Sequence, residues 1–261
     1  MILLGLDTAT AATAVALRLA DGSTMQARDD PSPGEHPGHA TRLLEMASGL
    51  LAEAGIGWRE IDRVAVGVGP GGFTGLRVGI ATARGLAQSL SVELVGVSSM
   101  RALAHTALTG EDHPGAGDRG ADSILAVIDA RRGEVFAAAY ERPGSHEPSA
   151  RGRAIELLAP SAIAPDGLTS VIERSQQGDG ERVRRWLAVG DGAVRYPDAV
   201  RATGVRAACA DSPLHRVSAA AICELGVDVK PAASWEEIVP DYRRRPDAEL
   251  ALEAAGARRA P

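Results

Sequence analysis

Two aspartates stand at the ends of short apolar runs, where a carboxylate is placed to handle phosphate chemistry. Asp7 closes the run that begins at Ile2, and Asp129 closes a similar run that begins at Ile124. In nucleotide-binding folds such carboxylates lie beside glycine-rich turns whose backbone N–H groups hold a phosphate. The turn after Asp7 opens with Thr8 and has no glycine, and the turn after Asp129 has only one, so positive φ is hard to reach in either. We therefore expect strand-end caps, with a residual phosphate site at Asp7, Thr8 and Asp129 as the open alternative.

The densest glycine cluster lies at residues 67–77, between an expected strand and an expected helix. Its glycines Gly67, Gly69 and Gly72 match the G-x-G-x-x-G spacing of dinucleotide-binding turns. The match fails on context, because Pro70 stiffens the turn and the preceding strand is not the first of its sheet. No Lys-Ser or Lys-Thr pair follows, so the cluster is not a nucleoside-triphosphate loop either. We expect a tight strand-to-helix turn whose N–H groups can receive an anion or a carbonyl group from another chain.

The helix expected from Thr74 to about Leu90 carries a ridge of small side chains. The ridge repeats every four residues and consists of Gly75, Gly79, Ala83 and Ala87. Small side chains permit the close approach of a second helix. The ridge is buried either within its own domain or, together with the helix expected at Leu43–Ala54, against another subunit; the sequence leaves both alternatives open.

Other candidates for metal or nucleophilic chemistry are few. His36 and His39 lie in a Pro- and Gly-rich stretch with no third histidine nearby, so we expect loop histidines and no zinc site. Cys209 and Cys223 show no metal-type spacing, and we expect both to be small buried side chains. No nucleophile motif and no defensible carboxylate pair is evident, so we expect no catalytic residue and no bound metal.

Composition limits the classes of function. The chain has 261 residues, of which 45% are hydrophobic and only 3% aromatic, so its core must be mainly aliphatic. A net charge of −6 argues against a protein that holds nucleic acid by itself. Lys230 is the only lysine, which leaves almost no room for Schiff-base or phosphate-loop lysine chemistry. Neither an apolar run of about 18 residues nor a signal-peptide pattern occurs, so we expect no membrane association and a cytoplasmic protein.

Strand and helix patterns position these residues and repeat along the chain. The first half is expected to hold strands at 2–6, 14–20, 24–28, 64–68 and 92–97, and helices at 43–54, 74–90 and 98–107. After a glycine-rich acidic stretch at 110–122, a strand ending in aspartate and a hairpin return at 124–140, and a further strand follows at 186–189. This repetition predicts a two-domain duplicated α/β fold with mixed sheets and flanking helices, divided into residues 1–104 and 105–261. The layout resembles that of actin, Hsp70-type ATPases and sugar kinases.

Residues 69–79 closely resemble the signature of the TsaB family of tRNA threonylcarbamoyladenosine biosynthesis proteins. The run reads Gly69, Pro70, Gly71, Gly72, Phe73, Thr74, Gly75, Leu76, Arg77, Val78 and Gly79. Shorter similarities at 128–131, 189–193 and 240–248 support the assignment. Gly72 stands where the family usually has serine, and Arg243 where it usually has leucine, which puts any hydroxyl role at the loop in doubt.

The resemblance implies a duplicated actin-like fold of the ribonuclease H-like class, without ATPase or transferase chemistry of its own. The metal-binding histidine pair of the larger paralogue TsaD would fall at Ser99 and Leu103, neither of which supplies an imidazole. The implied role is a non-catalytic subunit for threonylcarbamoyl transfer to the adenosine beside the anticodon of tRNAs that read codons beginning with A.

The resemblance also implies the partners. A TsaD-type paralogue would form a heterodimer with this chain, a TsaE-type ATPase would join them, and ATP and metal would belong to those subunits. The tRNA would be reached only through the complex. The loop and interface candidates are Gly69, Pro70, Gly71, Gly72, Phe73, Thr74, Gly75, Arg77, Gly79 and Ala83. A homodimer in isolation, an actin-fold kinase and a glycopeptidase-like hydrolase stay open as alternatives.

Overall fold

The computed structural model describes residues 1–32, 34–110, 120–143, 154–177 and 183–243. The first half contains β1 Leu3–Asp7, β2 Thr13–Arg18, β3 Thr24–Asp29, α1 His39–Ala54, β4 Arg63–Gly69, α2 Phe73–Leu90, β5 Glu93–Ser98 and α3 Ser99–Thr109. The second contains β6 Ser123–Arg131, β7 Glu134–Glu141, β8 Ile155–Ile163, α4 Leu168–Ser175, β9 Trp186–Val189, α5 Asp191–Arg195, α6 Pro197–Ala202, β10 Arg206–Ala207 and α7 Ala219–Val227. Most of the expected linker and the tail beyond residue 243 lie outside the described residues.

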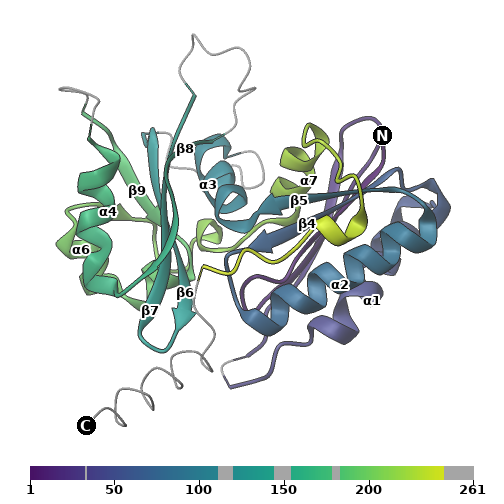
Figure 1. The fold of residues 1–261 in the computed structure, drawn as a ribbon, viewed down its shortest axis with the longest axis horizontal. Helices are drawn as coiled ribbons and strands as arrows, with labels where there is room; N and C mark the ends of the chain where they lie inside the picture. The colour runs from purple at the N-terminus through teal and green to yellow at the C-terminus, as the bar shows by residue number, and fades with distance from the viewer. Residues whose placement is uncertain (33, 111–119, 144–153, 178–182, 244–261) are drawn as a thin grey trace, which may run out of the picture.

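The two halves build the same kind of sheet (Figure 1). The first has the strand order β3-β2-β1-β4-β5, and the second, read from its other edge, has the order β8-β7-β6-β9-β10. In each, the leading strand pairs antiparallel with its hairpin partner and parallel with the strand on its other side. The mixed, duplicated α/β architecture expected from the sequence is therefore confirmed.

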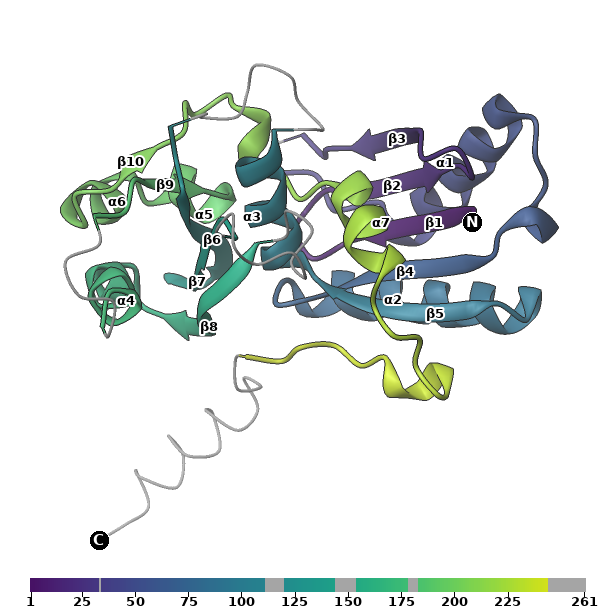
Figure 2. The same ribbon diagram turned by 90° about the horizontal axis from the view of Figure 1, so that it is seen from above.

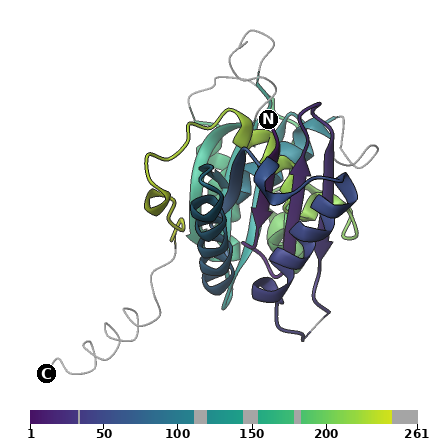
Figure 3. The same cartoon turned by 90° about the vertical axis from the view of Figure 1, so that its right-hand side faces the viewer.

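Helices cover both faces of each sheet. α1 and α2 lie side by side against the outer face of the first sheet (Figure 3). α3 and α7 fill the layer between the two sheets, where they share one hydrophobic cluster with strands of both (Figure 2). α4 and α6 pack on the far face of the second sheet. Among the described residues, none of the helices is both long and apolar enough to cross a lipid bilayer.

Local sequence explains why α1 forms and stops where it does. Leu43, Ala47 and Leu50 recur at helical spacing and are buried against the sheet. A fully buried leucine side chain contributes about 1.5–3 kcal/mol to folding. The helix ends at Gly55, which adopts φ 70° and donates its N–H to the last turn. The end of this helix and its cap agree with the expectation from the sequence, whereas its start lies at His39, four residues before the expected Leu43.

The C-terminal part of the chain returns to the first sheet. α7 packs on β1 and β2, and Cys223 fills the space above Gly5, where an added Cβ would meet its sulfur. The expectation of two buried cysteines is correct for Cys223 and wrong for Cys209, which is exposed. The proposed division between residues 104 and 105 stays a prediction; that position falls inside α3.

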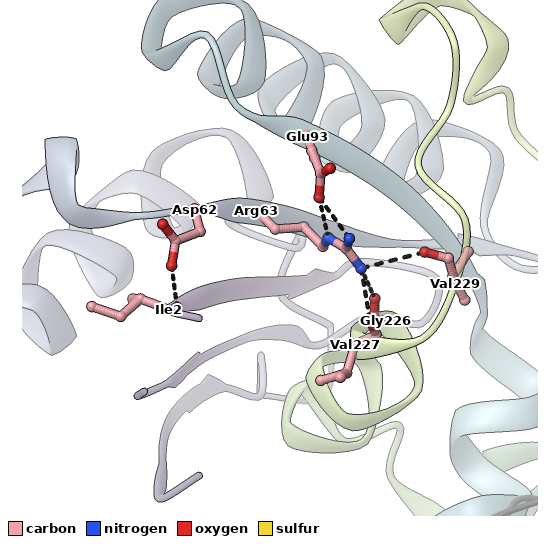
Figure 4. A network of polar contacts seen from close by, with 7 residues as sticks. All are labelled: Ile2, Asp62, Arg63, Glu93, Gly226, Val227 and Val229. Carbon is pink, nitrogen blue, oxygen red and sulfur yellow. Dashed lines mark hydrogen bonds and ion pairs between the residues drawn. The ribbon is translucent and has the colours of Figure 1, made fainter. Parts of the chain in front are cut away.

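A buried arginine fixes the end of α7 to the first sheet (Figure 4). The guanidinium of Arg63 donates to Glu93 Oε2 at 2.6 and 2.8 Å and to the carbonyl oxygens of Gly226 and Val227 at 2.8 Å. It also donates to Val229 O at 3.3 Å. The last carbonyls of a helix have no partner within the helix, so Arg63 supplies donors that α7 itself lacks.

Residues 228–243, which we call the strap, run from α7 across β5 and α2 toward the glycine loop. The N–H of Ala232 donates to Leu94 O at 3.1 Å, which pairs part of the exposed edge of β5. The guanidinium of Arg84 on α2 donates to Ile238 O at 2.7 Å. The N–H of Asp241 donates to Val68 O at 2.8 Å, at the end of β4. The strap therefore reaches the glycine loop, which comprises residues 67–77.

Candidate functional site

Asp7 is a buried cap of the β1–β2 turn. Its Oδ1 accepts the N–H of Ala9 at 3.0 Å, and its Oδ2 accepts the hydroxyl of Ser99 at 2.6 Å. Burial raises the pKa of the Asp7 carboxyl, and the hydrogen bond from Ser99 partly opposes that rise. The strand-end cap expected from the sequence is confirmed for this residue.

The glycine loop closes over the same turn. The N–H of Gly72 donates to Ala9 O at 2.7 Å, and the hydroxyl of Thr8 donates to Gly75 O at 2.7 Å. A Cβ on Gly71 would collide with the backbone of Ala9, so only glycine permits this approach. Hydrogen bonds donated from both sides thus join the glycine loop to the β1–β2 turn.

The expectation that this loop offers its N–H groups to another chain is wrong for two of its glycines. The N–H of Gly69 donates to the Ser99 hydroxyl at 3.2 Å, and that of Gly72 is used by Ala9. Ser99 is fully buried, and Leu103 lies in the core between the sheets. Among the described residues, no group of three or more His, Cys, Asp or Glu side chains could hold a metal ion.

The small ridge of α2 faces its own domain. A Cβ on Gly79 would collide with the Thr8 hydroxyl, and one on Gly75 would collide with the Thr8 carbonyl oxygen. Ala83 is fully buried in the cluster beneath α1 and α2. The assignment of Gly75, Gly79 and Ala83 to a partner interface is therefore wrong, because the chain's own turn and core fill the space along them.

His39 is also placed differently from the expectation. It begins α1, is buried, and lies with its Nδ1 2.9 Å from the Thr13 hydroxyl. Burial lowers the pKa of this imidazole. The helical spacing of His39 from Leu43 and Ala47 was the signal for this position, and the surrounding Pro and Gly residues obscured it.

The interface candidates divide between the interior and the surface. The buried ones are Gly69, Pro70, Gly75, Gly79 and Ala83, the exposed ones are Gly72, Phe73, Thr74 and Arg77, and Gly71 is half-buried. The Phe73 ring is 50% exposed and lies with its centroid 5.4 Å from that of Tyr242 in the strap. The guanidinium of Arg77 lies 3.7 Å over the Phe73 ring and donates to the Tyr242 hydroxyl at 2.8 Å. No pattern in the sequence predicts this contact between the glycine loop and the strap.

The outward face of α2 is exposed. Thr74, Arg77, Ala81 and Gly85 are exposed along it, and nothing lies within 4 Å of a Cβ built on Gly85. On the neighbouring α1, Leu44 is 46% exposed. Small side chains beside an exposed leucine permit a second helix to pack closely on this face.

The second strand-end aspartate caps the β6–β7 turn. Asp129 Oδ1 accepts the N–H of Arg131 at 2.9 Å, and the N–H of Asp129 donates to Asp191 Oδ1 at 2.9 Å. Burial raises the pKa of the Asp191 carboxyl. The cap expected at Asp129 is thus confirmed, and Asp191, at the start of α5, is a partner that sequence spacing did not reveal.

Comparisons with known proteins agree with this architecture. A family model described as TsaD, tRNA N6-adenosine threonylcarbamoyltransferase, matches residues 35–196. A protein named tRNA threonylcarbamoyladenosine biosynthesis protein TsaB from Escherichia coli (strain K12) is 36% identical over 205 residues, covering 78% of each chain. A protein of the same name from Bacillus subtilis (strain 168) is 25% identical over 215 residues, covering 81% of this chain and 82% of that relative. The solved structure of YeaZ from Pseudomonas aeruginosa superposes with a TM-score of 0.71 at 27% identity, covering 92% of this chain and 99% of that one.

Proposed function

The chain belongs to the TsaB family, and on this basis we propose that it is an accessory subunit in tRNA threonylcarbamoyladenosine biosynthesis. A TsaD-type paralogue transfers the threonylcarbamoyl group to the adenosine beside the anticodon of tRNAs that read codons beginning with A. A TsaE-type ATPase joins the pair. ATP and metal belong to these partner subunits, and the assembly works in the cytoplasm.

The closed β1–β2 turn is the observation that carries the accessory role. A phosphate at this position needs free backbone N–H groups and a gap above the turn. The N–H of Ala9 is used by Asp7, and the glycine loop packs directly on the Ala9 carbonyl. The Asp7 carboxylate is itself covered by Ser99 and fully buried. This arrangement supports a turn that stabilises the fold and does not bind nucleotide.

A calorimetric experiment separates this proposal from an autonomous kinase or hydrolase. The isolated full chain is titrated with ATP and Mg²⁺, and phosphate release is followed in parallel. We expect no saturable heat in the micromolar range and no hydrolysis above the buffer rate. Clear binding together with turnover that Asp7→Asn or Asp129→Asn abolishes would show an enzyme and refute the accessory role.

We place the TsaD-type partner on the outward face of α1 and α2, which Leu44, Ala81 and Gly85 line. This face is apolar at its centre and carries small side chains, so helices of a partner can pack against it. It replaces the buried ridge of Gly79 and Ala83 as the site to test, because bulky residues on the ridge would disrupt the fold itself.

The matched substitutions Gly85→Arg and Gly49→Arg test this face. Both glycines lie in exposed positions of long helices with no atom within 4 Å of an added Cβ. Replacing glycine removes a helix penalty of about 0.8–1 kcal/mol, so neither variant should unfold the chain. We expect Gly85→Arg to abolish copurification with the paralogue, whereas Gly49→Arg, which faces the groove beside β3, should retain it.

Equal copurification of the two variants with the paralogue would show that the interface does not lie on the outward face of α2. Sedimentation of the chain alone and with the paralogue shows whether the same face forms a homodimer when the partner is missing. If both the Gly85→Arg substitution and addition of the paralogue dissociate a homodimer, the homodimer contact and the paralogue contact would lie on this same face.

A further inference from the structure

Phe73, Arg77 and Tyr242, which we call the aromatic–arginine cluster, form an exposed group at the start of α2. The Arg77 guanidinium lies 3.7 Å from the centroid of the Phe73 ring and donates to the Tyr242 hydroxyl at 2.8 Å. The Phe73 and Tyr242 side chains, which contact each other, nevertheless stay 50% and 48% exposed. Exposed apolar side chains that adjoin one another favour an interaction surface more than isolated ones do.

The strap has other attachments near this cluster. The N–H of Asp241 donates to Val68 O at 2.8 Å, and the guanidinium of Arg84 donates to Ile238 O at 2.7 Å. Both contacts lie within a few residues of Tyr242 along the strap. Attachment of the strap therefore does not depend on Arg77 alone, and stacking on Phe73 leaves the charge of Arg77 uncompensated.

Arg77 carries the only exposed charge on α2. The helix has no Asp or Glu, and its other cation, Arg84, is half-buried and donates to the carbonyl oxygens of Glu236 and Ile238. Among the described residues, no carboxylate pairs with the Arg77 guanidinium, which donates from Nε to Tyr242. A guanidinium has five N–H donors in a planar fork, so most of those of Arg77 are available to an acceptor outside the chain.

We propose that Arg77 binds a carboxylate side chain of the TsaD-type paralogue, with Phe73 and Tyr242 as positioning residues. This proposal rests on the proposed function, which seats that partner on the outward face of α1 and α2. Thr74, Arg77 and Ala81 are exposed on the same side of α2, so an occupant of that face reaches the cluster. Stacking and the hydrogen bond hold the guanidinium in place before binding, which lowers the ordering cost of a bidentate contact with a carboxylate.

An RNA backbone is the other chemistry that a guanidinium can bind. Backbone binding uses several cations at once, and the next cation along the strap, Arg243, is paired with Asp241, Nε to Oδ1, at 2.6 Å. Arg77 also covers one face of the Phe73 ring, which leaves less of that ring for a stacked base. A single fixed guanidinium therefore fits one carboxylate of a protein better than a run of phosphates.

The test measures the dissociation constant of the full chain and the TsaD-type paralogue by calorimetry at low and at physiological salt. Arg77→Gln removes the charge, and glutamine forms helix about as well as arginine, so the fold should be retained. The matched control Arg201→Gln removes an exposed charge from α6, which packs on the far face of the second sheet. We expect Arg77→Gln to weaken binding about 10- to 30-fold and Arg201→Gln to weaken it less than about 2-fold. Thermal melts check that both variants are folded.

Salt dependence and a double-mutant cycle separate a contact with the partner from a purely structural role. If Arg77 meets a carboxylate, the affinity of wild type should fall more steeply with salt than that of Arg77→Gln. Tyr242→Phe keeps the ring and removes the hydroxyl, so it should weaken binding about 3-fold in the wild-type background. In the Arg77→Gln background it should have no further effect, because Tyr242 acts through Arg77. An equal loss in both backgrounds would show that Tyr242 only secures the strap and would refute its positioning role.

Two further results would overturn the proposal while leaving the proposed function intact. The first is an Arg77→Gln chain that binds the paralogue as tightly as Arg201→Gln does, while Gly85→Arg does not bind; the partner would then lie on α2 without reaching the cluster. The second is an unchanged dissociation constant for the paralogue together with weaker binding of an unmodified tRNA transcript by the Arg77→Gln complex, which would assign the cluster to RNA. A wild-type chain that does not bind the paralogue would overturn this proposal and the proposed function together.

Discussion

At the scale of single residues, Asp7 shows how a carboxylate at the end of a strand can serve the fold. It accepts two hydrogen bonds inside the chain, from Ala9 and from Ser99, and it is fully buried. A buried carboxylate pays a desolvation cost that hydrogen bonds offset only in part. Removing the side chain and neutralising its charge should therefore change the stability by different amounts.

Asp7→Ala should lower the free energy of unfolding by about 1–3 kcal/mol, because it leaves the Ala9 N–H and the Ser99 hydroxyl without an acceptor. Asp7→Asn keeps a side-chain oxygen for Ala9 and removes the buried charge, so it should unfold close to wild type at neutral pH. Urea denaturation of the two variants measures the difference. A larger loss for Asn than for Ala would contradict the role of Asp7 as a buried cap.

The pH dependence of the same variant follows from the raised pKa of Asp7. The folded state binds this proton more tightly than the unfolded state, whose pKa is near the ordinary 3.8. The stability contributed by Asp7 is therefore complete below pH 3.8 and is lost as pH rises through the folded pKa. Because Asp7→Asn does not titrate, its stability relative to wild type should increase with pH across this window. A difference that stays constant with pH would show that the pKa of Asp7 is the same in the folded and unfolded states.

At the scale of elements, the sequence predicts those whose signals are local. α1, α2 and the β1–β2–β3 hairpins come within a few residues of their expected bounds, because periodic burial and a cap such as Gly55 lie within the element itself. In the second half, β8 and α6 were not anticipated. α6 has only six residues, and the mostly half-buried side chains of β8 show no regular alternation of buried and exposed positions.

The side of α2 that meets its own domain could not be read from the sequence. The small ridge is a local pattern, but its occupant is Thr8, which reaches Gly79 only after the chain has folded. Gly85 looks like another helical glycine in sequence, yet it faces open space. The same pattern of small residues is thus buried on one face and exposed on another, and only tertiary structure separates them.

At the scale of the whole molecule, the chain's C-terminal part ties the glycine loop to the layer between the sheets. Arg63 fixes the end of α7, the strap crosses β5 and α2, and Tyr242 contacts Phe73 at the start of α2. The outward face of α2 and the central layer are therefore connected through one continuous segment. The stability of that segment should depend on its first anchor.

Replacing Arg63 by methionine tests this dependence. The variant retains a long apolar stem but leaves the carbonyl oxygens of Gly226 and Val227 without their donor, so we expect a loss of about 2–4 kcal/mol in the free energy of unfolding. Hydrogen exchange of the Ala232 and Asp241 amides should accelerate more than exchange within α1, because the strap is released before the domain unfolds. Arg63→Lys should fall between, since one ammonium group cannot span Glu93 and the carbonyls as the planar fork does. If Arg63→Met lowered global stability while strap exchange kept pace with that of α1, Arg63 would stabilise the fold as a whole, and the strap would not be a separately anchored segment.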